Sequence, residues 1–254
     1  MIDLHCHILP SIDDGSRSID ESIEMAREAY ECGFSSIFCT SHFIEESFVL
    51  KDKNQVILND LRENLILKSV DTNLYSGNEV YISSKIISWI LQNKFQTLNH
   101  SKYFLIELPF EAEVLYLNDI IFKSVLNGYV PIIAHPERYK FVQDNPNSLI
   151  NFIESGVLFQ MNYGSIIGIY GKEVSKTAAI LLKNNMIHFL GTDTHRKNSI
   201  YLKMDTIFYT LRKLIDEDTI DDLSLKNAQI VFENGNIKAH KPNYYKRSFF
   251  FSKN

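Results

Sequence analysis

Met1-Ile-Asp-Leu-His-Cys-His7 opens the chain. Residues 1–4 have the apolar character of a short strand, and alternate residues of a strand point to the same face. The imidazoles of His5 and His7 therefore leave the end of one strand on the same side, spaced to bind a single metal ion. For an isolated His-x-His pair, two unrelated surface histidines would be the simpler interpretation.

Further candidate ligands lie at matching positions. Asp193-Thr-His195 repeats the alternating geometry after another apolar run. Four other candidates each end a strand-like segment of their own: His42, Glu79, Glu107 and His135. Their number predicts a multinuclear metal site. Mixed imidazole and carboxylate ligands suit Mn, Fe or Zn better than Ca or Mg.

Strand-like runs and helical patterns alternate along the chain. Strands are predicted over residues 36–40, 74–76, 103–108, 130–134, 157–161 and 187–191. Helices are predicted over residues 19–32, 52–70, 83–92, 113–126, 148–155, 172–184 and much of 200–232. Ser18 is the expected N-cap of the first helix, and Gly33 its expected stop. About seven such units predict a single-domain parallel α/β barrel, whose site lies at the carboxyl ends of the strands.

Composition excludes several classes of protein. The 254 residues carry a net charge of −5, which argues against a nucleic-acid partner. No apolar run reaches the roughly 18 residues that span a bilayer. A signal peptide is not expected, because its cleavage would remove the candidate ligand at position 5. The three cysteines, Cys6, Cys32 and Cys39, fit no zinc-site spacing and indicate reduced thiols in a cytoplasmic protein.

These motifs together resemble the polymerase-and-histidinol-phosphatase (PHP) superfamily. More narrowly, they resemble its bacterial metal-dependent protein tyrosine phosphatases, which occur with capsule and exopolysaccharide genes. The resemblance runs from residue 2 to about residue 237. It is carried by residues 2–10 with Asp13-Asp-Gly15, Thr40-Ser-His42, Gly77-Asn-Glu79, Glu107-Leu-Pro109, His135-Pro-Glu-Arg138 and Thr192-Asp-Thr-His195. It implies a distorted (β/α)7 TIM-like barrel, the PHP fold, as one domain over residues 1–254 with a short basic-aromatic tail at about 240–254.

The resemblance also implies three divalent metals, with Mn expected and Fe, Zn or Co as alternatives. The first metal would be held by His5, His7, Glu79 and Asp193. Glu79 would bridge to a second metal, completed by Glu107 and His135. The third would be held by Asp14, His42 and His195, with Asp13 as the rival for the acidic position.

Arg138 is the expected catalytic phosphate clamp. A guanidinium matches two phosphoryl oxygens at once and does not deprotonate. A surface ion pair is the alternative interpretation. Family members often carry a second arginine five residues after the final Asp-x-His motif, where this chain has Ile200. Arg196 or Lys197 is the expected substitute in binding substrate.

The resemblance implies hydrolysis of phosphotyrosine on proteins by metal-activated hydroxide. The implied partner is a membrane-associated bacterial tyrosine kinase of polysaccharide synthesis. No cysteine is followed six residues later by arginine, which excludes the thiolate phosphatases. Two alternatives remain: a phosphatase for a small phosphoester such as histidinol phosphate, and a non-catalytic, metal-stabilised interaction module.

Several other segments have two interpretations. Phe110 and Tyr139, beside candidate ligands, are consistent with stacking on a substrate ring or with packing in the protein. Residues 164–172 resemble a phosphate-binding P-loop but lack its first glycine and its Ser/Thr, so a substrate-facing loop is expected. His188 is expected in the core. The tail, residues 244–251, is expected to dock on the barrel or a second subunit, with membrane attachment as the alternative.

Overall fold

The computed structural model describes residues 1–45, 51–238 and 240–246. Its strands form two parallel sheets. The first has the order β1 (Ile2–Cys6), β2 (Ser36–Cys39) and β4 (Asn73–Ser76). The second has the order β3 (His42–Phe43), β5 (Glu79–Tyr81), β6 (Tyr103–Glu107), β7 (Val130–Ala134), β8 (Leu158–Asn162) and β9 (Phe189–Gly191).

The two sheets together make one distorted barrel. Only two residues separate β2 from β3, and two separate β4 from β5, so the described strands occupy seven positions around the ring. Between β1 and β9 the ring closes through backbone bonds. The Asp193 N–H donates to the His5 carbonyl at 2.7 Å, and the His7 N–H donates to the Thr194 carbonyl at 3.0 Å. The predicted (β/α)7 barrel is confirmed, and its distortion is the break in the second and third strand positions.

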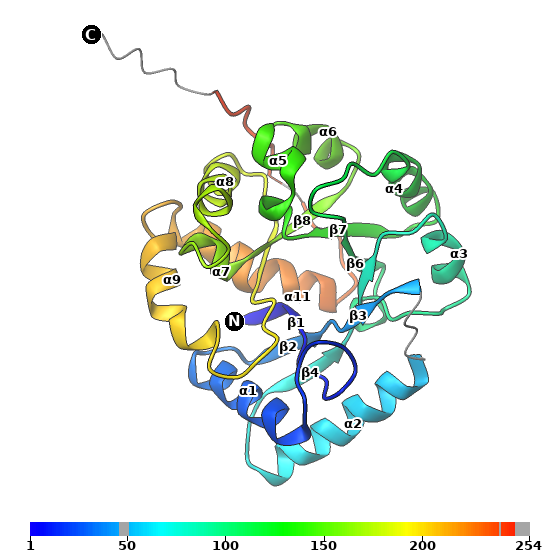
Figure 1. Ribbon diagram of the computed structural model, residues 1–254, viewed down its shortest axis with the longest axis vertical. Coiled ribbons are helices and arrows are strands. Elements are labelled where there is room, and N and C mark those ends of the chain that lie inside the picture. Colours follow the sequence, from blue (N-terminus) through cyan, green and yellow to red (C-terminus); the bar gives the residue numbers. More distant parts are fainter. Residues whose placement is uncertain (46–50, 239, 247–254) are drawn as a thin grey trace.

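Helices surround this ring (Figure 1). The α-helices are α1 (Ile19–Glu31), α2 (Lys51–Leu67), α3 (Ile86–Leu91), α4 (Leu117–Leu126), α5 (Lys140–Asp144), α6 (Ser148–Glu154), α7 (Tyr163–Ile166), α8 (Lys172–Lys183), α9 (Met204–Leu211), α10 (Glu217–Asp221) and α11 (Asn227–Phe232). Short 3-10 turns cover Leu98–His100, Pro136–Arg138 and Tyr201–Lys203, and a π-helical turn covers Asp222–Lys226.

The predicted element boundaries are partly confirmed and partly wrong. Ser18 caps α1 as expected, accepting a bond from the Glu21 N–H at 3.2 Å. The helix predicted from residue 83 begins three residues later, because the Ser83 hydroxyl accepts a bond from the Lys85 N–H and holds a turn there. The segments β3, β5, α5 and α7 were not predicted, since two to five residues carry too little periodicity.

Strand residues are buried on both faces. In β6, Tyr103 and Leu105 belong to one apolar cluster, and Phe104 and Ile106 to another. The cluster that contains Leu105 draws side chains from several strands and fills the barrel. Helix α11 lies across one end of the ring (Figure 1) and contributes Val231 to this cluster. The barrel is therefore filled at that end, and its functional groups lie at the other.

The described part of the tail docks on the barrel. The side chain of Asn147 binds both backbone groups of Tyr245, at 2.8 and 3.0 Å. The Asn243 N–H donates to the Asn184 carbonyl at 2.9 Å. Residues 247–254, the rest of the predicted basic-aromatic tail, lie outside the described residues. Within the described part of the chain, no helix has the length and apolar character needed to cross a membrane.

Candidate metal centre

The predicted ligands converge at the carboxyl ends of the strands. His5 and Glu107 lie near the ends of β1 and β6. His42 and Glu79 begin the short strands β3 and β5, just beyond the ends of β2 and β4. His7, His135, Asp193 and His195 follow directly after β1, β7 and β9. Parallel strands bring all these ends to one mouth of the barrel, which is why residues far apart in sequence meet there.

The carboxylate of Glu79 lies at the centre of this group and is only 1% exposed. Four imidazole nitrogens surround it, those of His42 at 3.0 Å, His135 at 3.1 Å, and His5 and His7 at 3.3 Å. An oxygen of Glu107 lies 3.7 Å from His135 Nε2, and the second oxygen lies 3.8 Å from His42 Nδ1. One oxygen of Glu79 thus faces His135 and the other faces the remaining three imidazoles.

Among the residues that the structure describes, three overlapping groups of side chains could hold a metal ion. They are His5 with His7 and Asp193; His42 with Glu79 and Glu107; and His7 with Asp14, His42 and His195. His7 and His42 each belong to two groups, whereas the family resemblance implies one metal for each. The structure therefore brings together every predicted ligand, and His135 joins the others through its contact with Glu79. The imidazoles of His7 and His42 could each serve either of two metals.

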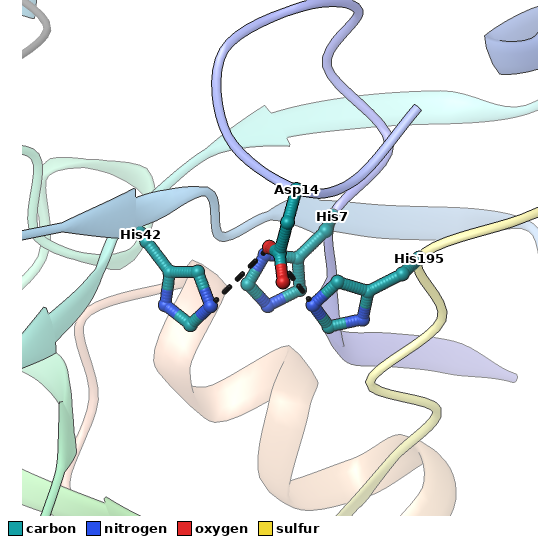
Figure 2. Close-up of side chains that lie close together, drawn as sticks. All are labelled: His7, Asp14, His42 and His195. Atoms are coloured by element: carbon teal, nitrogen blue, oxygen red, sulfur yellow. Dashed lines mark ion pairs between the residues drawn. The ribbon is translucent and has the colours of Figure 1, made fainter. Parts of the chain in front are cut away.

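Asp14 and Asp13 have different environments. Figure 2 shows the Asp14 carboxylate between His42 and His195, with Oδ1 at 3.5 Å and 3.3 Å from their Nε2 atoms. Asp13 instead accepts bonds from His7 Nδ1 and the His42 N–H, both at 2.8 Å, and from the Gly15 N–H at 2.9 Å. Asp14 could therefore contribute an oxygen to a cation, whereas both oxygens of Asp13 are occupied by hydrogen bonds, one of them to the ring of His7.

Burial and the charges of neighbouring side chains strongly shift the pKa values of several side chains in this group. Burial raises the pKa of Glu107 to about 7, and the Glu79 carboxylate acts in the same direction. Burial alone would lower the pKa of His5, but the charges of Glu79 and Asp193 outweigh it and raise this pKa to about 9. Such protons are what a divalent cation displaces on binding.

The spacing and orientation of the donor atoms fit a divalent cation. The Nδ1 atoms of His5 and His7 are bonded to Gln160 Oε1 and Asp13 Oδ2, each at 2.8 Å. Their Nε2 atoms, which are left as ligands, lie 3.1 Å apart. Two nitrogen ligands about 2.1 Å from one ion, at a right angle, are separated by about 3.0 Å. The pair is therefore spaced to share a metal.

Arg138 lies at the rim of the centre. Its Nη1 donates to Asp193 Oδ2 at 3.2 Å. Its guanidinium lies between two aromatic rings, 4.4 Å from the centroid of Phe110 and 4.6 Å from that of Tyr170. The expected loop over residues 164–172 thus faces the site through Tyr170, although its first residues form α7.

The other predictions near the site have mixed outcomes. Tyr139 is fully buried and its hydroxyl accepts a bond from the Leu108 N–H, so it packs in the protein and does not face a substrate. His188 lies in the core as expected. Arg196 donates from Nη1 to the carbonyls of Gly15 and, at 2.8 Å, His195. One nitrogen of the Arg196 guanidinium is thus already hydrogen-bonded to backbone carbonyls.

Sequence reasoning missed three side chains at the site. Gln160 and Asn162, which are fully buried in β8, contact ligands, and Tyr170 contacts Arg138. The signal for the first two was present, because polar residues alternate at the end of the apolar run 157–161. Nothing in the local sequence distinguishes Tyr170 from an ordinary loop tyrosine.

Comparison with known proteins identifies the family. The family described as capsular polysaccharide synthesis, CpsB/CapC, matches residues 1–233. The chain is 32% identical to tyrosine-protein phosphatase YwqE of Bacillus subtilis, over 99% of each chain. It is 31% identical to putative tyrosine-protein phosphatase CapC of Staphylococcus aureus, again over 99% of each.

Solved structures agree. One from a study of YwqE from Bacillus subtilis and CpsB from Streptococcus pneumoniae, described as metal-dependent tyrosine phosphatases, superposes with a TM-score of 0.91 at 32% identity. It covers 97% of this chain and 100% of its own. Histidinol phosphate phosphatase from Lactococcus lactis shares the fold, with a TM-score of 0.56 at 16% identity over 84% of this chain and 93% of its own. The chain belongs to the CpsB/CapC family of capsular polysaccharide synthesis.

Proposed function

We propose that this protein is a metal-dependent phosphatase that hydrolyses phosphotyrosine on proteins during polysaccharide synthesis. The observation that carries the proposal is the convergence of nine imidazole and carboxylate side chains beside Arg138, at one mouth of the barrel. The relatives named as tyrosine phosphatases support the choice of substrate. The proposed enzyme is one domain over residues 1–254, with a short tail from about residue 240.

We assign the nine ligands to three divalent cations, with Mn²⁺ as the proposed ion. His5, His7 and Asp193 would hold the first, and Glu79 would bridge to a second held by Glu107 and His135. The third would be held by Asp14, His42 and His195. When bound, clustered divalent cations lower the pKa of a water molecule and stabilise charge on a phosphoryl group.

Arg138 would bind the phosphoryl oxygens. Its side chain is 24% exposed at the rim, so the guanidinium can meet substrate while Asp193 and the two rings hold it in place. Arg196 was expected to provide a second contact. Because its Nη1 binds the Gly15 and His195 carbonyls, we assign it first to holding the loop of Asp14 against the strand end of His195.

The proposed partner is a phosphotyrosyl protein, a membrane-associated bacterial tyrosine kinase. The proposed location is the cytoplasm. The free thiols of Cys6, Cys32 and Cys39 support a reducing compartment.

A substrate comparison tests the assignment. The protein loaded with Mn²⁺ is given a phosphotyrosyl peptide, the same peptide with phosphoserine, and histidinol phosphate. We expect the phosphotyrosyl peptide to be turned over with the highest kcat/KM. A clear preference for histidinol phosphate would assign the chain to small phosphoesters. Bound metal without turnover of any of the three would instead indicate a non-catalytic module.

A further inference from the structure

Two buried amides in β8 connect the metal ligands to one another. Gln160 and Asn162 are fully buried and, two residues apart on a strand, point to the same side. Gln160 Oε1 lies 2.8 Å from His5 Nδ1, and Gln160 Nε2 donates to Asn162 Oδ1 at 3.0 Å. Asn162 Nδ2 then donates to Asp193 Oδ2 at 2.7 Å. An unbroken chain of hydrogen bonds thus runs from His5 to Asp193.

The direction of this chain is set at its acidic end. An ionised carboxylate only accepts, so the group of Asn162 that faces Asp193 must be its NH₂. The Asn162 oxygen then faces Gln160 and must accept from the Gln160 NH₂. The Gln160 oxygen is left for His5, whose Nδ1 must therefore carry the proton.

This arrangement prepares both ends for a cation. With one proton fixed on Nδ1, His5 has only Nε2 to offer as a ligand, and Nε2 faces the centre, where a cation would displace its proton. Asp193 Oδ2 accepts from Asn162 and from Arg138, which leaves Oδ1 facing the same centre, 3.5 Å from the Nε2 atoms of His5 and His7. Metal-bound histidines and carboxylates are commonly oriented by such outer hydrogen bonds.

The neighbouring backbone keeps room for the two amides. Gly191 of β9 pairs with Asn162, and a Cβ at Gly191 would lie 2.9 Å from Gln160 Nε2 and 2.8 Å from His5 Cβ. A side chain there would displace Gln160 from His5. The Asn162 N–H also donates to the buried carboxyl of Glu137 at 3.0 Å, which fixes the backbone at the end of β8.

From these contacts we infer that Gln160 and Asn162 are positioning residues, which orient His5 and Asp193 as metal ligands before the metal binds. The inference rests on the proposed metal centre and not on the identity of the substrate.

The test measures Mn²⁺ affinity of the full chain by competition with a chelator, without any substrate. Gln160→Met and Asn162→Ala are each expected to weaken the tightest Mn²⁺ site by about 10- to 100-fold. Gln96→Met is the matched control, because Gln96 is also a buried amide, 2% exposed, but donates to Gln55. It should lower the thermal stability of the metal-free protein to a similar extent and leave the Mn²⁺ affinity unchanged.

A conservative variant separates positioning from packing. Gln160→Glu restores an acceptor for His5 Nδ1 and should recover much of the affinity that Gln160→Met loses. Equal affinity of Gln160→Glu and Gln160→Met would overturn the role of the His5 contact. Wild-type Mn²⁺ affinity in Gln160→Met and Asn162→Ala, or an equal loss in Gln96→Met, would overturn the inference as a whole. Because no turnover is measured, none of these results depends on the phosphatase assignment.

Discussion

Arg138 and Asp193 are joined by a hydrogen bond of 3.2 Å between Nη1 and Oδ2, at the border between the metal centre and the open mouth of the barrel. The bond uses the Asp193 oxygen that faces away from the metal ligands, so a cation and the guanidinium can share one carboxylate. The rings of Phe110 and Tyr170 also contact the guanidinium, with centroids at 4.4 Å and 4.6 Å. Arg138 is thus held in place by the protein itself, without any substrate.

Replacing Arg138 should separate metal binding from catalysis. Arg138→Ala is expected to lower kcat/KM for a phosphotyrosyl peptide by about 10²- to 10³-fold, the usual cost of losing one preorganised donor to developing charge. Metal content, measured by mass spectrometry of dialysed protein, should stay at the wild-type value. Arg138→Lys keeps the charge but loses the two-pronged contact, so its activity should be intermediate. Normal turnover by Arg138→Ala would refute the clamp.

Replacing a buried ligand should, in contrast, lower the amount of metal that the protein binds. His5→Ala takes away one nitrogen that faces Glu79 and Asp193, so the protein should retain less metal after dialysis. His100→Ala is the control, because His100 is exposed and lies in the 3-10 turn outside the ligand cluster. If His5→Ala bound as much metal as His100→Ala, the assignment of His5 would fail.

The two adjacent aspartates should differ in metal stoichiometry. Asp14→Ala removes the carboxylate between His42 and His195, so we expect one bound metal fewer per chain. Asp13→Asn keeps an oxygen that can accept from His7 Nδ1, and should retain the stoichiometry with weaker affinity. Metal analysis of both variants, dialysed side by side, measures the difference. Loss of a metal in Asp13→Asn alone would reverse the assignment.

His188 should contribute to acid destabilisation. Burial lowers its pKa to about 3, against an ordinary value of about 6.5 in the unfolded chain. Between these values the unfolded chain binds the proton and the folded protein does not, so the free energy of unfolding falls as the pH falls. One such group contributes up to about 1.4 kcal/mol per pH unit.

Urea unfolding of the metal-free protein between pH 5 and pH 7 measures this effect. His188→Asn retains an acceptor for the Phe159 N–H, which Nδ1 of His188 accepts at 3.1 Å, but it does not titrate. Its stability should therefore depend less steeply on pH than that of the wild type. The same slope for both proteins would show that His188 is not the titrating group.

The sequence by itself determined the architecture and indicated most of the side chains that gather at one mouth of the barrel. Strand and helix periods are local properties, and seven alternating units close into a parallel barrel. A ligand that ends a strand, such as His5 or His135, must then lie at the same mouth as the others, because parallel strands end at one mouth. Arg138 could be placed for the same reason, by its distance from the end of β7.

Tertiary structure alone decided which contacts each of the groups at that mouth makes. Asp13 and Asp14 are chemically identical neighbours, and only the fold of their loop turns one toward His7 and the other toward His42 and His195. The orienting roles of Gln160 and Asn162 likewise depend on β9 passing β8 at Gly191. Hydrogen-bond partners that are distant in sequence have no periodic signal, so these contacts could be seen only once the chain had folded.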